Sequence, residues 1–262
     1  MRARECLARH WPEYLMEAWG LGVFMLAAGA ATVALEAAAS PLHGLVADPA
    51  TRRTLIGAAM GLTAVGLIYS PWGRQSGAHL NPAVTLAFLW LGRIARCDAA
   101  FYILAQFIGG TLGVLLAFVL FGAAFSHAPV SYIATLPGSD GAGAAFVAEM
   151  LISFGLMATV LAFVRRPRLA PYTGLAAGLL IALYIFFEAP LSGMSMNPAR
   201  SFASAAPSGL WRDAWIYYSA PFAGMLVAAA AHRRRADARA CAKLYHARDR
   251  RCIHCGYQPP AP

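Results

Sequence analysis

Two short stretches decide the fold of this chain: SGAHLNPAVT at residues 76–85 and SMNPARSF at residues 195–202. Each contains an Asn-Pro-Ala motif, made by Asn81, Pro82 and Ala83 in the first and by Asn197, Pro198 and Ala199 in the second. Asparagine is a favoured helix N-cap, and proline is favoured at the first helical position. Each motif therefore predicts a helix start. The apolar sequence that follows ends near Leu91 and Ala206, so each helix is about ten residues or about 15 Å long.

The composition around these motifs is typical of a membrane protein. Of 262 residues, 59% are apolar and only 13% are charged, which is too little charge to cover a soluble domain. A span needs about 20 apolar residues. Six segments of suitable length are predicted, at about residues 13–35, 54–70, 99–125, 144–164, 172–188 and 214–231. The first is too long, and lacks the small-residue cleavage pattern, for a signal peptide.

The six segments and two motifs form an internal repeat. Glu17 opens the first span and Glu149 opens the fourth, and each half contains three spans and one half-helix. Three crossings are an odd number, so the second half enters the bilayer upside down. The predicted fold is an all-α membrane protein of six transmembrane helices and two half-helices that meet from opposite faces. Small residues that would allow close helix packing are Gly109, Gly110, Gly113, Gly174 and Gly178.

The predicted boundaries give one channel domain with two tails. The domain covers residues 13–231, with repeat one at about 13–125 and repeat two at about 144–231. A cytoplasmic tail at residues 1–12 precedes it, and a basic cytoplasmic tail at residues 232–262 follows it.

The formal charge of +9 could suggest nucleic-acid binding, but the basic residues lie in short clusters between apolar segments, as in membrane topology. With both ends inside, seventeen basic residues are cytoplasmic: Arg2, Arg4, Arg9, Arg74, Arg93, Arg96, Arg165, Arg166, Arg168, Arg233, Arg234, Arg235, Arg239, Lys243, Arg248, Arg250 and Arg251. Only four are outside: Arg52, Arg53, Arg200 and Arg212. This topology places all the cysteines on the cytoplasmic side: Cys6, Cys97, Cys241, Cys252 and Cys255. Structural disulfides are not expected, because that compartment keeps thiols reduced.

The paired motifs predict a pore that excludes charge. Two helix N-termini facing each other create a positive potential that repels cations. Asn81 and Asn197 can each cap a helix with oxygen and point an N–H into the lumen. A water molecule that accepts from both has its hydrogens turned away, which breaks a proton wire. Irregular backbone before each motif would offer a ladder of carbonyls, at Gly77, Ala78 and His79 and at Gly193, Met194 and Ser195.

One Asn-Pro-Ala would be an ordinary capped helix, but two copies in matching places resemble the signature loops of the aquaporin and glycerol-facilitator family. The resemblance covers about Glu13 to Ala231. It implies a homotetramer with one pore per subunit, loop support by Glu17 and Glu149, and an outer filter of four residues. Arg200 is the charged filter member. The other three positions fall on Met194, Ile185 and Met60, with Gly61 as the alternative to Met60 if the loop at residues 71–75 carries no extra residue.

The same resemblance gives a divided answer on the solute. Strict water channels of the family usually carry histidine where this chain has Ile185. Ser201 and Ala205 replace the charged residues typical of glycerol channels, and Tyr217 and Tyr218 match the paired aromatics of water channels. The predicted function is a passive channel for water, with small uncharged solutes left open. A glycerol facilitator with minor water flux is the alternative.

Other classes fit the sequence less well. An ion-coupled transporter would need more intramembrane charges than Glu17 and Glu149. No nucleophile, base or metal cluster gathers within the spans, so an enzyme is not expected. His79 is expected to bond the loop backbone, and Glu188 to be solvated near the outer mouth.

The basic tail carries a separate signal. Its arginines are expected to contact anionic lipid. Cys252 and Cys255 form a Cys-x-x-Cys motif with Cys241 and His246 upstream. A lone motif of this kind is weak, so no cofactor is expected and a zinc ion at Cys252 and Cys255 is kept as an alternative. The arginine and alanine bias indicates a bacterial genome and thus a bacterial inner membrane.

Overall fold

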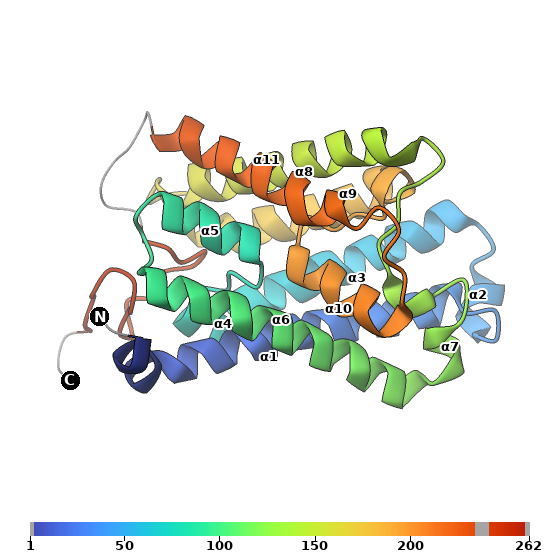
Figure 1. Cartoon of the computed structure of the whole chain (residues 1–262), viewed down its shortest axis with the longest axis horizontal. Coiled ribbons are helices and arrows are strands. Elements are labelled where there is room, and N and C mark those ends of the chain that lie inside the picture. Colours follow the sequence, from blue (N-terminus) through green and yellow to red (C-terminus); the bar gives the residue numbers. More distant parts are fainter. Residues whose placement is uncertain (1–2, 234–240, 260–262) are drawn as a thin grey trace.

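The computed structural model describes residues 3–233 and 241–259, and every regular element in these ranges is a helix. Six long helices and two half-helices dominate (Figure 1): α1 (Ala3–Glu36), α3 (Pro49–Tyr69), α5 (Pro82–Trp90), α6 (Arg96–Phe121), α8 (Gly141–Val164), α9 (Thr173–Ser192), α10 (Pro198–Ser208) and α11 (Trp215–Arg233). Short helical segments lie in the connections between them: α2 (Pro41–Leu45), α4 (Pro71–Ser76), α7 (Ala123–Ser126), and the 3-10 helices η1 (Ser131–Ile133) and η2 (Ala170–Tyr172). The predicted all-α architecture is confirmed. Arg2, Arg234, Arg235 and Arg239 of the orientation argument lie outside the described residues.

Four helical segments are long and apolar enough to cross a membrane by length and composition alone: Ala3–Glu36, Arg96–Phe121, Gly141–Val164 and Ala170–Ser192. Helices α3 and α11 have 21 and 19 residues, which is about 30 Å of helix, but their composition is less apolar. Large apolar side chains remain exposed on four different helices, as at Leu112 (59%), Leu151 (58%), Leu179 (62%) and Val227 (56%). Such an apolar exterior fits lipid rather than water.

Equivalent helices of the two halves make equivalent contacts. Helix α1 packs on α6 as α8 packs on α11, and α3 packs on α9 between the halves. In Figure 1, α5 lies toward the end that holds both termini and α10 toward the opposite end, with their N-termini near the middle. The inverted repeat predicted from the two motifs is therefore the observed arrangement.

Glycine contacts bring the helices close together. A Cβ on Gly109 would lie 2.0 Å from the Ala18 carbonyl oxygen, and one on Gly113 would lie 2.2 Å from that of Gly22. Helix α6 thus touches the backbone of α1 directly. Across the halves, Gly178 of α9 meets Gly61 of α3, where a Cβ would lie within 2.6 Å of backbone oxygen. The predicted packing role of these glycines is confirmed.

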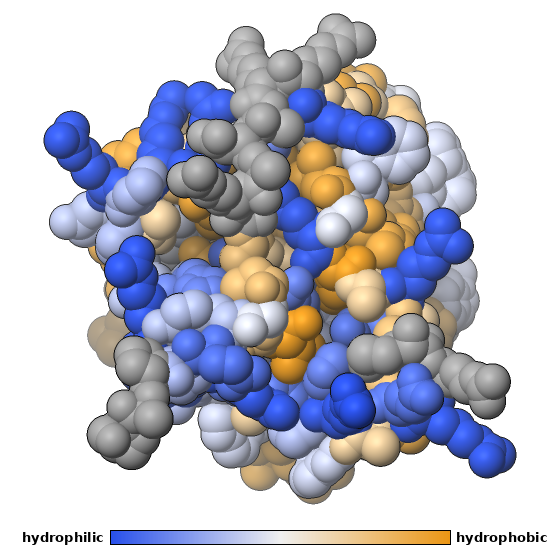
Figure 2. Space-filling view, turned by 90° about the vertical axis from the view of Figure 1, so that its left-hand side faces the viewer, coloured by the Kyte–Doolittle hydropathy of each residue, from blue (hydrophilic) through white to orange (hydrophobic). Residues whose placement is uncertain are grey.

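The end that holds the termini is polar at its rim. Figure 2 views this end and shows hydrophilic side chains around a partly apolar centre. Helix α1 begins at Ala3. Residues 3–12, which were predicted to belong to the N-terminal tail, are therefore part of the first helix. The division into one channel domain and two tails otherwise stays a prediction.

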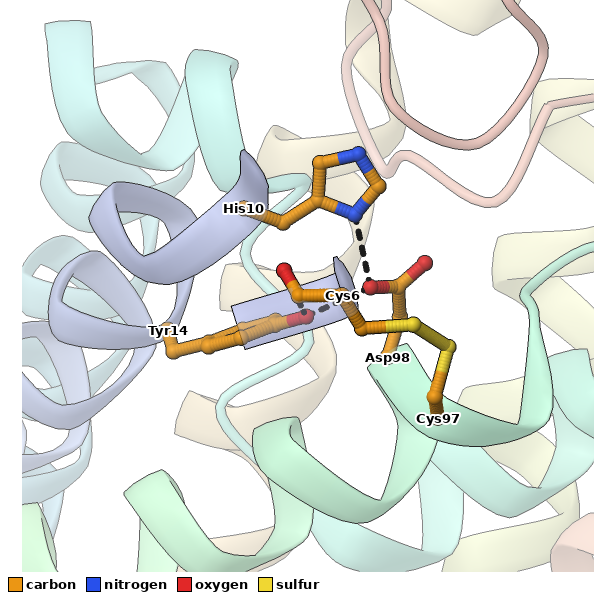
Figure 3. Close-up of a disulfide and its surroundings, with 5 residues drawn as sticks. All are labelled: Cys6, His10, Tyr14, Cys97 and Asp98. Atoms are coloured by element: carbon orange, nitrogen blue, oxygen red, sulfur yellow. Dashed lines mark hydrogen bonds and ion pairs between the residues drawn. A yellow bond between two sulfur atoms is a disulfide. The ribbon is translucent and has the colours of Figure 1, made fainter. Parts of the chain in front are cut away.

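A disulfide at this end contradicts the expectation that the cysteines are unpaired. Cys6 of α1 and Cys97 of α6 are joined (Figure 3). Beside them, Asp98 lies 2.8 Å from His10 Nδ1 and accepts a hydrogen bond from the Tyr14 hydroxyl at 2.6 Å. The expectation considered only the redox compartment. It missed that α1 extends far enough to place Cys6, which is fully buried, against the first turn of α6, where Cys97 lies.

Candidate functional site

Each half-helix begins at the asparagine of its motif. The Asn81 side-chain oxygen accepts from the Ala83 N–H at 2.8 Å. The Asn197 oxygen accepts from the N–H groups of Ala199 and Arg200 at 3.1 and 3.3 Å. In both, proline follows the cap at the first helical position. The predicted caps are therefore present on both helices.

The two helix tips contact each other through the same asparagines. Asn81 Nδ2 donates to the Met196 carbonyl at 2.8 Å, and Asn197 Nδ2 donates to the Leu80 carbonyl at 2.7 Å. Each amide nitrogen carries a second hydrogen. Both residues also line a cavity, so that hydrogen is free to face its interior.

This cavity has a volume of about 600 Å³. It extends from Glu36 and Arg53, at the end opposite the termini, past both asparagines to Ile68 and Leu244 at the other end. Its walls are mostly apolar side chains with few polar groups between them. The cavity therefore passes between the two helix tips.

A buried glutamate holds the loop before each motif. Glu17 accepts from the Ser76 hydroxyl at 2.7 Å and from the backbone N–H groups of His79 and Leu80 at 3.1 and 2.7 Å. Glu149 makes the matching bonds: the Ser192 hydroxyl at 2.7 Å and the N–H groups of Ser195 and Met196 at 2.6 and 2.7 Å. Both carboxylates are fully buried, and neither lines the cavity.

Sequence reasoning missed further loop supports. The Tyr102 hydroxyl donates to the Ser76 carbonyl at 2.7 Å, and the Tyr217 hydroxyl donates to the Ser192 carbonyl at 2.5 Å. Gln106 also donates to Glu17 at 2.9 Å. A residue-by-residue alignment of the two halves would have paired the tyrosines. The sequence indicates Tyr217 only as one of two paired aromatics.

The loop backbone adopts left-handed conformations that side chains rarely take. Ala78 and Leu80 have φ of 53° and 49°, and Met194 and Met196 have 52° and 54°. Such strained residues persist only where surrounding contacts fix them, as the two glutamates do here. Propensity alone does not indicate these angles.

Most of the predicted carbonyl ladder lines the cavity: Ala78, His79, Gly193, Met194 and Ser195. Gly77 is the exception. It does not line the cavity, and its carbonyl accepts a hydrogen bond from the Leu244 N–H at 3.1 Å. The C-terminal segment that occupies this position was not foreseen from the sequence.

All four predicted filter residues line the cavity: Met60, Ile185, Met194 and Arg200. The alternative to Met60, Gly61, instead packs against α9. Arg200 Nη1 donates to the Ile133 carbonyl at 2.8 Å. Turn η1, which contains Ile133, has no sequence signal that predicts this contact.

Two single-residue expectations are wrong. His79 does not bond its own loop backbone: its Nδ1 lies 3.1 Å from the Thr85 hydroxyl, and its Nε2 lies 2.6 Å from the carbonyl of Ala242. Glu188 is not solvated. It is 5% exposed, because α9 continues through Pro190 to Ser192 and position 188 therefore lies within the helix rather than at its outer end.

Of the positions weighed for solute type, Ser201 lies within hydrogen-bond distance of Thr135 (2.8 Å) and Ser195 (2.6 Å). Ala205 is buried. Neither of these two, nor Tyr217 or Tyr218, lines the cavity. Ser201 and Tyr217 instead bond the loop before the second motif, and Ala205 packs within the half-helix that follows it.

Potential metal ligands gather outside the spans. Cys252 and Cys255 lie with Cys241 and His246, all four ligand atoms being within 4.8 Å of one another. A second group, Cys6, Cys97 and Asp98, has its two sulfurs bonded to each other.

Comparison with known proteins agrees with this geometry. The sequence model described as "Major intrinsic protein" matches residues 6–232. "Probable aquaporin NIP4-2" from Arabidopsis thaliana is 39% identical over 166 residues, 63% of this chain and 56% of that protein. "Aquaporin NIP1-4" from Oryza sativa subsp. japonica is 38% identical over 178 residues, 68% of this chain and 63% of that protein. The matches thus span about three fifths of these relatives.

A solved structure shares the fold. The aquaglyceroporin from Plasmodium falciparum superposes with a TM-score of 0.70 at 20% identity, covering 86% of this chain and 96% of that one. Paired half-helices, buried loop glutamates and the family match over nearly all of the helical domain lead to one conclusion. The chain is an integral membrane protein that belongs to the major intrinsic protein family.

Proposed function

We propose that this protein is a passive channel that conducts water, admits small uncharged solutes, and excludes protons and ions. One observation carries the proposal. The side-chain amides of Asn81 and Asn197 bind the opposite loop's backbone while both residues line a cavity that reaches both ends of the helical bundle.

The proposed exclusion of charge follows from these tips. Each half-helix N-terminus carries about half a positive charge, and the mostly apolar walls replace only part of a cation's hydration shell. A water molecule that accepts from the remaining amide hydrogens of both asparagines cannot also donate along the file in both directions. Protons then have no continuous hydrogen-bonded path at this point, whereas neutral water passes.

The proposed solute range follows from the filter. Arg200 adds a positive barrier and N–H donors, and its contact with the Ile133 carbonyl fixes the guanidinium. The side chains of Met60, Ile185 and Met194 are apolar and offer no hydrogen bond that favours water over a small alcohol. A facilitator of glycerol or a similar neutral solute with minor water flux is therefore the second candidate, supported by isoleucine at position 185.

Ion-coupled transport and catalysis are not part of the proposal. Glu17 and Glu149 already accept hydrogen bonds from the loops and do not line the cavity. We further propose a homotetramer, in which the exposed apolar helix faces contact neighbouring subunits and lipid. Both termini would face the cytoplasm of a bacterial inner membrane, as the arginine distribution favours.

A pair of tryptophan variants on α9 tests the route. Ile181 lines the cavity, whereas Leu179, two residues earlier, is 62% exposed on the outer surface. In stopped-flow light scattering, proteoliposomes with the wild-type protein should shrink faster than protein-free vesicles. Ile181→Trp should remove this excess and Leu179→Trp should keep it. Equal shrinkage of wild-type and protein-free vesicles would contradict the proposed function.

A further inference from the structure

The channel function does not explain the C-terminal segment at residues 241–259, here called the tail cap. It contains no helix or strand, yet Ala242, Ala247 and Cys252 are at most 4% exposed. In Figure 1 it folds against the end of the bundle that holds the termini. An irregular segment this short buries too little apolar surface to order itself, so additional interactions must hold it.

Four side chains of the tail cap converge on one point. Cys241 Sγ lies 3.4 Å from Cys252 Sγ, and His246 Nε2 lies 3.2 Å from Cys255 Sγ. All four atoms lie within 4.8 Å of one another. A tetrahedral Zn²⁺ with Zn–S bonds of about 2.3 Å needs sulfur atoms about 3.8 Å apart. The cluster therefore has the ligand types, number and spacing of a structural Cys₃His zinc site.

The backbone around Cys252 and Cys255 is shaped for this role. Gly256 follows the second cysteine with φ of 72°, and its N–H donates to the Cys252 carbonyl at 3.0 Å. The Cys252 N–H in turn donates to the Tyr257 carbonyl at 2.9 Å. The tight turn thus brings both sulfurs to the same side.

Charge around the cluster favours a cation bound by thiolates. Three thiolates, a neutral imidazole and Zn²⁺ together carry one negative charge. Lys243, 2% exposed, lies close enough to interact electrostatically with all three cysteines. Its ammonium would compensate that charge, and it also donates to the Arg74 carbonyl at 3.1 Å.

The tail cap also reaches the pore. The Leu244 N–H donates to the Gly77 carbonyl at 3.1 Å, and the Ala242 carbonyl lies 2.6 Å from His79 Nε2. Both contacts are on the loop before the first motif. Leu244 lines the cavity at its cytoplasmic end. In the sequence it lies two residues before His246, between the ligands Cys241 and Cys252.

We propose that Cys241, His246, Cys252 and Cys255 bind one zinc ion, and that this ion holds the tail cap over the cytoplasmic end of the pore, where Leu244 narrows the pore and slows water flow without stopping it. The metal site stands independently of the proposed channel function. The closing role rests on the proposed channel function.

Metal analysis of the full-length protein tests the site. The protein is expressed with ample zinc and purified without a histidine tag. Inductively coupled plasma mass spectrometry should then find one zinc ion per chain. The double variant Cys252→Ser/Cys255→Ser should lose the zinc. The matched variant Cys6→Ser/Cys97→Ser, which also removes two cysteines, should keep it. Absence of stoichiometric zinc, iron in its place, or a Cys241–Cys252 disulfide in peptide mass spectra would overturn the site.

Osmotic permeability tests the closing role. Protein stripped with EDTA before reconstitution should conduct water severalfold faster than zinc-loaded protein, and adding Zn²⁺ back should reverse the change. The Cys252→Ser/Cys255→Ser variant should be fast and insensitive to zinc. Leu244→Ala should be fast while it retains its zinc. Equal rates for loaded and stripped protein overturn the closing role but leave the metal result intact. If no form conducts water, the proposed function fails along with the closing role, and zinc content still decides the site.

Discussion

At the scale of single residues, each asparagine has two tasks. Its oxygen caps its own half-helix, and its nitrogen binds the opposite loop. Both tasks follow from the amide carrying an acceptor and two donors, which aspartate does not provide. The cap was predictable from Asn-Pro-Ala. The cross-loop bond was not, because it depends on how closely the two tips approach.

Residue 185 tests the solute range. Ile185→His introduces a larger, polar ring into the wall of the cavity that Arg200 also lines, and so narrows the predicted filter. We expect glycerol permeability to fall about tenfold, which corresponds to about 1.4 kcal/mol at the barrier, with water flux nearly unchanged. Light scattering in glycerol and sorbitol gradients measures both. Ile185→Val, which keeps an apolar side chain, is the control, and glycerol flux that is equal in both variants would show that residue 185 is not in the filter.

Residue 149 tests loop support. In Glu149→Gln, an NH₂ group replaces one carboxylate oxygen and faces either the Met196 N–H or the Ser192 and Ser195 donors. A buried donor without an acceptor costs about 1–3 kcal/mol, so the melting temperature in detergent should fall. Asp140→Asn, at the exposed start of the same helix with no side-chain cap bond, should melt like the wild type. Equal melting of both variants would argue against loop support.

At the scale of elements, hydropathy and length predicted the helices well, because lipid requires every span to be apolar and internally hydrogen-bonded. Predicted spans differ from the observed helices mainly at their ends, as where α9 continues past Pro190 to Ser192. The connections were harder to predict. Turn η1 supplies the carbonyl that holds Arg200, and nothing periodic in its sequence indicates that position.

Close helix packing leads to a prediction about glycine. Gly109→Ala would place a methyl group 2.0 Å from the Ala18 carbonyl oxygen, so α1 and α6 must separate. Overpacking of this kind costs about 1–3 kcal/mol and should lower the melting temperature in detergent. Gly66→Ala on α3 has no heavy atom within 4 Å and should be neutral or slightly stabilising. If both variants melt alike, direct backbone contact between α1 and α6 is not important for stability.

At the scale of the whole molecule, the odd number of spans in each half made the inverted arrangement predictable before any coordinates. The loop glutamates bind the two loops, and the four residues predicted to form the filter line the cavity. What sequence could not predict comes from contacts between distant segments. The tail cap on the first loop and the Cys6–Cys97 disulfide join segments that no local pattern connects.

The central claim is that two asparagine-capped tips form a route for water and a barrier to protons. Simultaneous stopped-flow measurement in one proteoliposome preparation tests it most directly, with light scattering for water and an enclosed pH-sensitive dye for protons. We predict fast water exit with proton leak equal to that of protein-free vesicles. A proton leak that rises in proportion to the amount of reconstituted protein would contradict the account.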